Sequence, residues 1–258
     1  MDEATVTTRF ETREGGRIAR VTLENAKRAN CLSSPLIEAL AHAFRELAPL
    51  DDLRLAVLTG AGDRSFMAGA DLNEMGSADP PAARRYITGL QAMHQAIRDL
   101  PVPVIARING ACFGAGLETA ASCDLRLASD SARFGMPETV IDLPSVIEAA
   151  LFPRLIGWGR TAWLVYRGDA IDAATALDWG LVERAVPAAE LDTAVDELVD
   201  VICRNGPTGI RLQKALMREW ERSSIDDGVR AGIDYLEDAY RRGDPVGRIA
   251  AYRKDRSV

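Results

Sequence analysis

Apolar and polar residues alternate in short runs over the first part of the chain, and these runs predict β-strands. Residues 17–25, RIARVTLEN, alternate between two faces, which is typical of a strand with one buried side. Residues 53–60 (LRLAVLTG) and 102–110 (VPVIARING) are apolar on both faces, which is typical of strands inside a parallel sheet. The first part of the chain therefore predicts a sheet whose middle strands are buried.

Helical periodicity lies between these strands. In residues 33–50 the apolar positions recur every three or four residues, with Ser34 as the predicted N-cap and Pro35 at the first helical position. A shorter helix is predicted over residues 115–122, and a strand follows in residues 124–129. Strands that alternate with helices indicate an α/β fold with parallel pairing.

Beyond residue 145 the pattern becomes mostly helical. An Asn-Gly-Pro sequence at residues 205–207 interrupts this helical part and is the best candidate for a boundary. We therefore expect an α/β core over residues 1–205 and a separate helical segment over residues 206–258.

Composition excludes several classes of partner. The formal net charge of -7 argues against nucleic acid, because binding phosphates requires a basic face. No apolar run approaches the ~20 residues that span a bilayer, and the N-terminus has no secretory pattern. The four cysteines form no CxxC pair and no metal-binding spacing with the two histidines. We therefore expect reduced thiols in the cytoplasm and no metal site.

Two loops share one design, in which small residues follow an apolar segment and a helix begins soon afterwards. They are SFMAGAD, residues 65–71, and CFGAGLE, residues 112–118. Helix N-termini carry unpaired amide donors, and small side chains let a ligand approach them. Amides from both loops could form an oxyanion hole for a polarised carbonyl, although glycines could also simply permit tight turns. LTGAGDRS (residues 58–65) and GAGLET (residues 114–119) do not complete G-x-G-x-x-G, because Ser65 and Thr119 stand where the third glycine should be, and this excludes a dinucleotide site.

Two glutamates are candidate catalytic groups. Glu118 lies in the first turn of the predicted helix, where it could also act as a cap, and Glu138 follows a proline and could be a surface turn residue. Two carboxylates at one polarised carbonyl could divide the roles of acid and base, because like charges raise one pKa. His42 and His94 lie on helical stretches without a serine or cysteine signature, so we interpret them as ordinary helix residues.

Over most of its length the chain resembles the crotonase, or enoyl-CoA hydratase/isomerase, superfamily. The similar segments, in order, are ENAKRANCL, LTGAGDRSFMAGADLNEM, PVIARINGACFGAGLETAASCDLRLAS, FGMPE, GDAIDAATALDWGLVERAVP and GPTGIRLQKAL. The resemblance implies a spiral of β-β-α repeats. It further implies C-terminal helices that pack into a homotrimer, often paired into a homohexamer.

By position, the resemblance assigns the oxyanion amides to Ala70 and Ala115 and the two acids to Glu118 and Glu138. Both acids together imply the hydratases, which add water syn across the C2–C3 double bond of a 2-enoyl-CoA. One carboxylate would activate the water while the other delivers a proton to C2.

The resemblance also implies how the acyl-CoA substrate is held. The CoA part would contact Lys27, Ala29 and Ala68, together with Ala70 of the oxyanion loop. Coenzyme A is then part of the substrate, and no permanently bound cofactor is expected.

The chain departs from the family pattern after Glu138. The segment TVIDLPSVIEAALFPRLIG places Asp142 at a usual glycine and adds Glu148 nearby. Because this segment shapes the acyl pocket, two other hypotheses stay open. One keeps the fold but catalyses double-bond isomerisation, thioester hydrolysis or a lyase reaction. The other is a non-catalytic module that binds acyl-CoA or protein.

Overall fold

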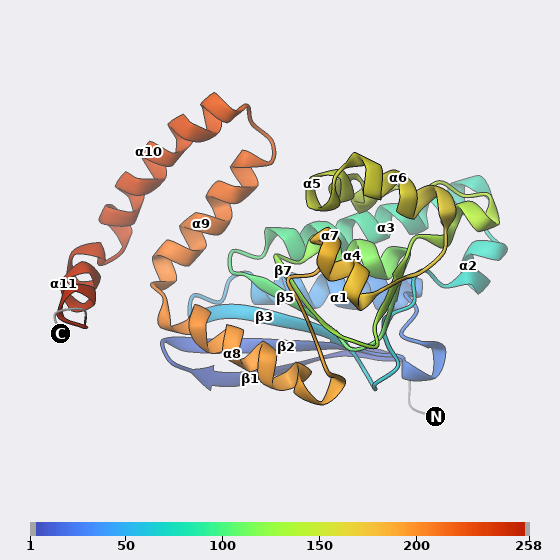
Figure 1. Ribbon diagram of the computed structural model, residues 1–258, viewed down its shortest axis with the longest axis horizontal. Helices are drawn as coiled ribbons and strands as arrows, with labels where there is room; N and C mark the ends of the chain where they lie inside the picture. The colour runs from blue at the N-terminus through green and yellow to red at the C-terminus, as the bar shows by residue number, and fades with distance from the viewer. Residues whose placement is uncertain (1–3, 256–258) are drawn as a thin grey trace.

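The computed structural model describes residues 4–255, which form two sheets and the helices around them (Figure 1). The larger sheet has six strands in the order β1-β2-β3-β5-β7-β10. Their bounds are β1 Thr5–Arg13, β2 Gly16–Glu24, β3 Leu53–Gly60, β5 Val104–Ile108, β7 Leu125–Ser129 and β10 Arg184–Val186. β1 is antiparallel to β2, and all other pairs in this sheet are parallel.

The smaller sheet has the order β4-β6-β8-β9, with only β9 antiparallel to its neighbour. Its strands are β4 Ser65–Met67, β6 Ala111–Phe113, β8 Arg133–Gly135 and β9 Ile171–Asp172. The chain passes from a strand of the larger sheet to a strand of the smaller sheet and then into helix. Thus β3 and β4 precede α2 (Leu72–Gly76) and α3 (Pro80–Asp99), and β5 and β6 precede α4 (Ala115–Ser122). This is the expected spiral of β-β-α repeats.

The middle strands of the larger sheet are buried on both faces, to which successive side chains of a strand point in turn. Along β3, Ala56 and Leu58 pack into the main core with α1 (Ser34–Leu47), α3 and α4. Leu55 and Val57 instead pack against α8 (Leu191–Arg204). The continuous apolar run of this strand follows from that double burial.

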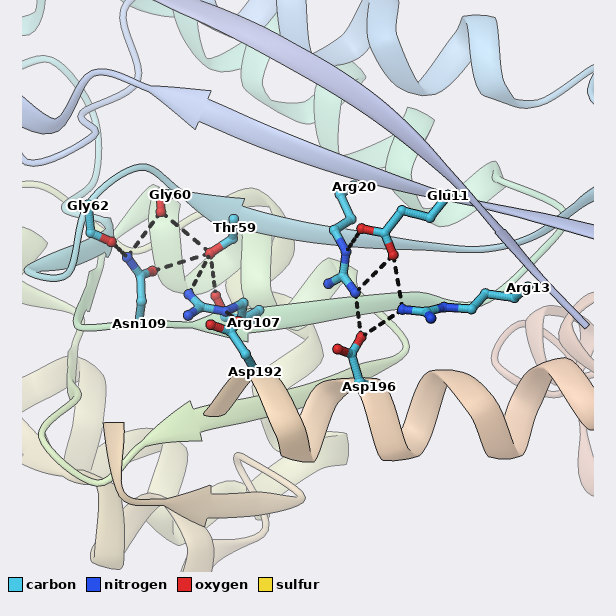
Figure 2. Close-up of polar contacts among 10 residues, drawn as sticks. All are labelled: Glu11, Arg13, Arg20, Thr59, Gly60, Gly62, Arg107, Asn109, Asp192 and Asp196. Carbon is cyan, nitrogen blue, oxygen red and sulfur yellow. Dashed lines mark hydrogen bonds and ion pairs between the residues drawn. The ribbon is translucent and has the colours of Figure 1, made fainter. Parts of the chain in front are cut away.

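Ion pairs also join α8 to the sheet (Figure 2). Asp196 of α8 pairs with Arg20 of β2 and, at 3.3 Å, with Arg13 of β1. One turn earlier, Asp192 accepts a hydrogen bond of 2.6 Å from Nε of Arg107 on β5. The pairs involve three different strands, so they fix the direction of α8 across the sheet.

The remaining helices follow the spiral. They are α5 Phe152–Ile156, α6 Trp158–Arg167, α7 Ala173–Trp179, α9 Pro207–Trp220, α10 Ile225–Arg242 and α11 Pro245–Asp255, with 3-10 turns η1 Ala26–Arg28, η2 Pro137–Ile141, η3 Ile147–Leu151 and η4 Ala188–Glu190. Figure 1 shows α10 and α11 standing away from the two sheets. Lys214 links α9 to the core, because its Nζ donates to Asp124 and to the carbonyl of Val102, both at 2.8 Å.

Several sequence expectations are confirmed, and one is wrong by a residue. The predicted strand at residues 53–60 and the helix at residues 115–122 have the expected bounds. The N-cap of α1 is Ser33 rather than Ser34, and Pro35 is accordingly the second helical residue rather than the first. The physical reason is Glu74 of α2. Its carboxylate accepts one hydrogen bond from the Ser34 amide, at 3.0 Å, and another from the Ser34 hydroxyl, and so it caps the first turn.

Two further expectations concern the whole chain. No helix within residues 4–255 is long and apolar enough to cross a membrane. All four cysteines are free thiols. The ends of the two segments expected from the sequence, residues 1–3 and 256–258, lie outside the described residues.

Candidate active site

A cavity of about 530 Å³ lies where the two small-residue loops meet the segment after β8. Its polar lining includes Glu118 and Glu138, and its apolar lining comes from α2, α3 and residues 140–146. The residues that line it are Arg28, Cys31, Ala68, Gly69, Ala70, Asp71, Leu72, Asn73, Met75, Ile87, Leu90, Gly114, Ala115, Glu118, Pro137, Glu138, Val140, Ile141, Leu143, Pro144 and Val146. A mostly apolar pocket with a few convergent polar groups is typical of a small-molecule site.

Ala70 presents its amide from the first loop. The backbone on either side of it bonds Leu32: the Leu32 amide donates to Gly69 at 2.9 Å, and the Asp71 amide donates to Leu32 at 3.1 Å. In a parallel bridge of this kind, the residue between the two bonds directs its own amide to the opposite side. The amide of Ala70 is therefore turned away from Leu32, and Ala70 lines the cavity.

Ala115 presents the second amide, at the start of α4. The carbonyl of Gly114 accepts the amides of Leu117 and Glu118 at 2.8 and 3.0 Å, which leaves the first amide of the helix without an intrahelical acceptor. The two loops run close together, because a Cβ added to Gly69 would lie 3.9 Å from the Ala115 nitrogen. The structure thus brings both predicted oxyanion residues to one cavity.

An asparagine side chain and a glycine hold the loops in place. Asn109, which follows β5, donates to the carbonyls of Gly60 and Gly62 at 3.0 and 2.6 Å, at the end of β3 and just after it (Figure 2). A Cβ on Gly116 would lie 2.0 Å from the carbonyl oxygen of Met67. Only glycine at this position lets α4 pack against the first loop.

Glu118 is buried in the wall of the cavity, with 4% of its surface exposed. Its Oε1 accepts a hydrogen bond of 3.1 Å from the amide of Ala149. Burial is the main cause that raises the pKa of Glu118 to about 8; the nearby charges of Glu138 and Glu148 contribute to this rise, and the Ala149 amide opposes it. Glu118 therefore carries a proton at neutral pH in the unliganded protein.

Glu138 comes to the same place from the 3-10 turn η2. Its Oε2 accepts a hydrogen bond of 3.0 Å from the hydroxyl of Ser145. Its Oε1 lies against the second loop, only 2.6 Å from where a Cβ on Gly114 would be. Burial raises the pKa of Glu138, while its own backbone amide and Ser145 oppose this effect. One wall of the cavity thus holds two carboxylates that share a raised proton affinity.

Only some of the residues expected near the CoA part line the cavity. Ala68 lines the cavity, whereas Lys27 and Ala29 are exposed on and just after η1. Ala29 nevertheless touches the first loop, because its carbonyl accepts the amide of Ala68 at 3.1 Å. Arg28, between the two, does line the cavity.

Sequence reasoning did not single out three groups that contact the two acids or stand behind them. They are the hydroxyl of Ser145, the amide of Ala149 and the imidazole of His94, which is fully buried and bonded to Glu148 at 2.7 Å. His94 lies on a helix as expected, but its partner is 54 residues away in sequence. No local pattern signals a contact over that separation.

The raised pKa of Glu118 predicts a stability effect. Between about pH 4.5 and 8 the folded protein keeps a proton that the unfolded chain has lost, so this group lowers the free energy of unfolding as the pH rises through that window. Glu118→Gln should remove this penalty and be more stable than the wild type at pH 8, by a few kcal/mol. At pH 4.5 the two proteins should differ little.

Urea unfolding at both pH values measures the effect, with Glu38→Gln, an exposed glutamate of α1, as the control. The control should follow the wild type at every pH. Equal pH dependence in the wild type and Glu118→Gln would contradict the raised pKa.

Comparisons with known proteins agree with this architecture. The family model described as enoyl-CoA hydratase/isomerase matches residues 13–242. A short-chain-enoyl-CoA hydratase of Clostridium acetobutylicum is 30% identical over 244 residues, 94% of each chain, and a crotonyl-CoA hydratase of Syntrophomonas wolfei is 30% identical over 243 residues, again 94% of each.

A solved structure is similar over nearly the whole chain. The crystal structure of an enoyl-CoA hydratase from Bacillus anthracis superposes with a TM-score of 0.92 at 30% identity, covering 98% of this chain and 97% of that one. Family model, sequence relatives and fold agree over the same range. The chain therefore belongs to the enoyl-CoA hydratase/isomerase, or crotonase, family.

Proposed function

We propose that this protein is an enoyl-CoA hydratase, which adds water across the C2–C3 double bond of a 2-enoyl-CoA. One observation carries the proposal: Glu118 and Glu138 line the same cavity as Ala70 and Ala115. Two carboxylates suit an addition that needs a base for water and an acid for carbon. Two amides suit a thioester oxygen that gains charge during the reaction. The hydratase names of two relatives point the same way.

The reaction follows from these groups. The thioester oxygen accepts hydrogen bonds from the amides of Ala70 and Ala115, which draws electrons away from C3. The ionised carboxylate takes a proton from water as the water oxygen bonds to C3, and negative charge moves to the thioester oxygen. The protonated carboxylate then gives its proton to C2, and the double bond is consumed. Proton transfer between the acids restores the starting state.

The CoA part is proposed to lie along the first loop. Ala68 lines the cavity, and the Lys27 to Ala29 turn packs on the loop through the Ala29 carbonyl. Lys27 and Arg28 lie beside this end, Arg28 in an ion pair of 2.8 Å with Asp71, and cationic side chains here suit the phosphates of CoA. CoA enters and leaves with the substrate, so no resident cofactor is part of the proposal.

The departure from the family pattern after Glu138 adds no acid to the cavity. Among the described residues, Asp142 is exposed and does not line the cavity, and Glu148 is bonded to His94 behind it. Other chemistry on this fold, isomerisation, thioester hydrolysis or a lyase step, therefore gains no extra catalytic group from this segment. Its contribution to the lining is apolar, through Val140, Leu143 and Val146.

Product analysis tests the proposal. Crotonyl-CoA incubated with the protein should gain the mass of one water and yield 3-hydroxybutyryl-CoA. Free CoA would show a hydrolase, and a displaced double bond in a longer enoyl-CoA would show an isomerase. Tight CoA binding without turnover of any enoyl-CoA would show a binding module.

Gly114→Ala is expected to lower kcat by about 100-fold, because the new Cβ would lie 2.6 Å from Oε1 of Glu138 and displace it. Gly114 also has a φ of +51°, so alanine there is strained and should cost ~1–3 kcal/mol of stability. Steady-state kinetics and urea unfolding measure the two effects. Gly159→Ala on α6 is the control, since its Cβ would meet nothing within 4 Å. Full activity in Gly114→Ala would contradict the placement of Glu138.

We also propose that the protein forms a homotrimer or homohexamer through its C-terminal helices. One face of α10 supports this, with apolar side chains that are 55% to 86% exposed: Ile225, Val229, Ile233, Leu236 and Tyr240. Such a face is unusual on a monomer. Light scattering should give three or six chains for the wild type and fewer for Ile233→Asp. A monomeric wild type would refute the proposal.

A further inference from the structure

Three polar side chains are buried together behind Glu118. His94 of α3 and Thr119 of α4 are fully buried, and Glu148 of η3 is 9% exposed. His94 contacts both of the others, since Nδ1 lies 2.7 Å from Glu148 Oε2 and Nε2 lies 3.0 Å from Thr119 Oγ1. This unit of three residues, which we call the His94 cluster, joins three separate elements at one point.

The hydrogen bonds of the His94 cluster have a defined direction. The hydroxyl of Thr119 donates to the carbonyl of Ala115 at 2.7 Å, so its oxygen is left to accept the Nε2 proton of His94. Nδ1, on the other side of the ring, is then the atom that bonds Glu148 Oε2 at 2.7 Å. Each member has its partner, as buried polar groups require.

Each end of the His94 cluster lies next to a residue that takes part in the proposed reaction or orients one that does. At one end, Thr119 holds the carbonyl of Ala115, which lines the cavity and is proposed to supply one oxyanion amide. At the other end, Glu148 precedes Ala149, whose amide is shared between the Val146 carbonyl at 3.0 Å and Glu118 Oε1 at 3.1 Å. The cluster therefore connects the start of α4 with the donor that orients its catalytic carboxylate.

We propose that His94, Thr119 and Glu148 are positioning residues, which fix the Glu118 carboxylate relative to the Ala115 amide by locking η3 onto α4. This inference rests on the proposed hydration. The cluster does not touch the substrate, because none of its members lines the cavity. It acts through Ala149 and Ala115, and misplacing a catalytic group by about 1 Å costs ~100-fold in rate.

Thr119→Val is the sharpest test, because it removes the acceptor of His94 and keeps the shape of the side chain. We expect kcat for crotonyl-CoA hydration to fall ~10–100-fold with KM changed less than about threefold. Thr119→Ser, which restores the hydroxyl, should recover kcat to within about threefold of the wild type.

Thr161→Val is the matched control. Thr161 is also a buried helical threonine whose hydroxyl donates four residues back, to Gly157 at 2.9 Å, but it has no contact with the His94 cluster. Its kcat should stay at the wild-type value even if its stability falls. If Thr119→Val keeps the kcat of the wild type, or if Thr119→Ser loses as much kcat as Thr119→Val, the positioning role is overturned.

A structural readout separates this inference from the proposed function. In a crystal structure of Thr119→Val, the distance from the Ala149 nitrogen to Glu118 Oε1 should exceed the 3.1 Å of the native site and leave hydrogen-bonding range. An unchanged distance would overturn the positioning role whatever the reaction is. If the wild type turns over no enoyl-CoA, the hydratase proposal fails, and this distance still decides whether the cluster positions Glu118.

Discussion

Glu138→Gln is expected to lower kcat for crotonyl-CoA hydration by ~10²–10⁴-fold, with little change in binding of the CoA thioester. Glutamine has nearly the same shape and can keep the bond from Ser145, which is 3.0 Å in the native site. It can neither take nor give a proton at the reacting carbons. The effect should therefore fall on the chemical step rather than on KM.

Asp142→Asn is the control for Glu138→Gln. Asp142 follows Glu138 closely in sequence, but it is exposed and lies outside the cavity lining. Its φ of +63° suits asparagine, so this substitution should not strain the backbone. Asp142→Asn should keep wild-type activity. If both variants lose activity, the segment tolerates no change. If neither variant loses activity, Glu138 has no part in the mechanism.

Glu118→Gln should reduce kcat by a similar factor and should also change the pH profile. In the wild type, Glu118 loses its proton as the pH rises through about 8, and it can then no longer serve as the acid. The kcat/KM of the wild type should therefore fall above about pH 8, with an apparent pKa that belongs to the coupled pair. The residual activity of Glu118→Gln should lack this alkaline limb.

Two measurements on the same variant distinguish a catalytic role from damage to the fold. Glu118→Gln should lose activity while it gains stability at pH 8, since the buried carboxylate is removed. A misfolded variant would lose both. An alkaline limb that stays in the same place in Glu118→Gln would assign that limb to another group.

The sequence predicts the elements whose burial is indicated by the pattern of their own residues. The sequence predicts β3 because this strand is apolar on both faces, and both faces are covered. It does not predict β1, because the sequence TVTTRFETR is polar and the strand lies at the edge of the sheet, largely exposed. It misplaces the N-cap of α1 because Glu74 caps the helix from another element.

The candidate site likewise contains residues that the sequence identifies and residues that it does not. Both small-residue loops and both glutamates could be found from sequence, because each loop is a short motif and the family pattern orders them. The residues behind them could not. Ser145 bonds a carboxylate seven residues before it, Ala149 contributes only its amide, and His94 meets Glu148 across 54 residues. Such contacts are set by how the spiral folds back, and side-chain type does not reveal them.

The most direct test of the central claim is the initial loss of enoyl thioester absorbance with crotonyl-CoA, for the wild type beside Glu138→Gln and Glu118→Gln. The two-carboxylate hydratase predicts rapid loss in the wild type and a fall of ~10²–10⁴-fold in each variant. Absence of loss in the wild type while CoA still binds, or full activity in either variant, would contradict it.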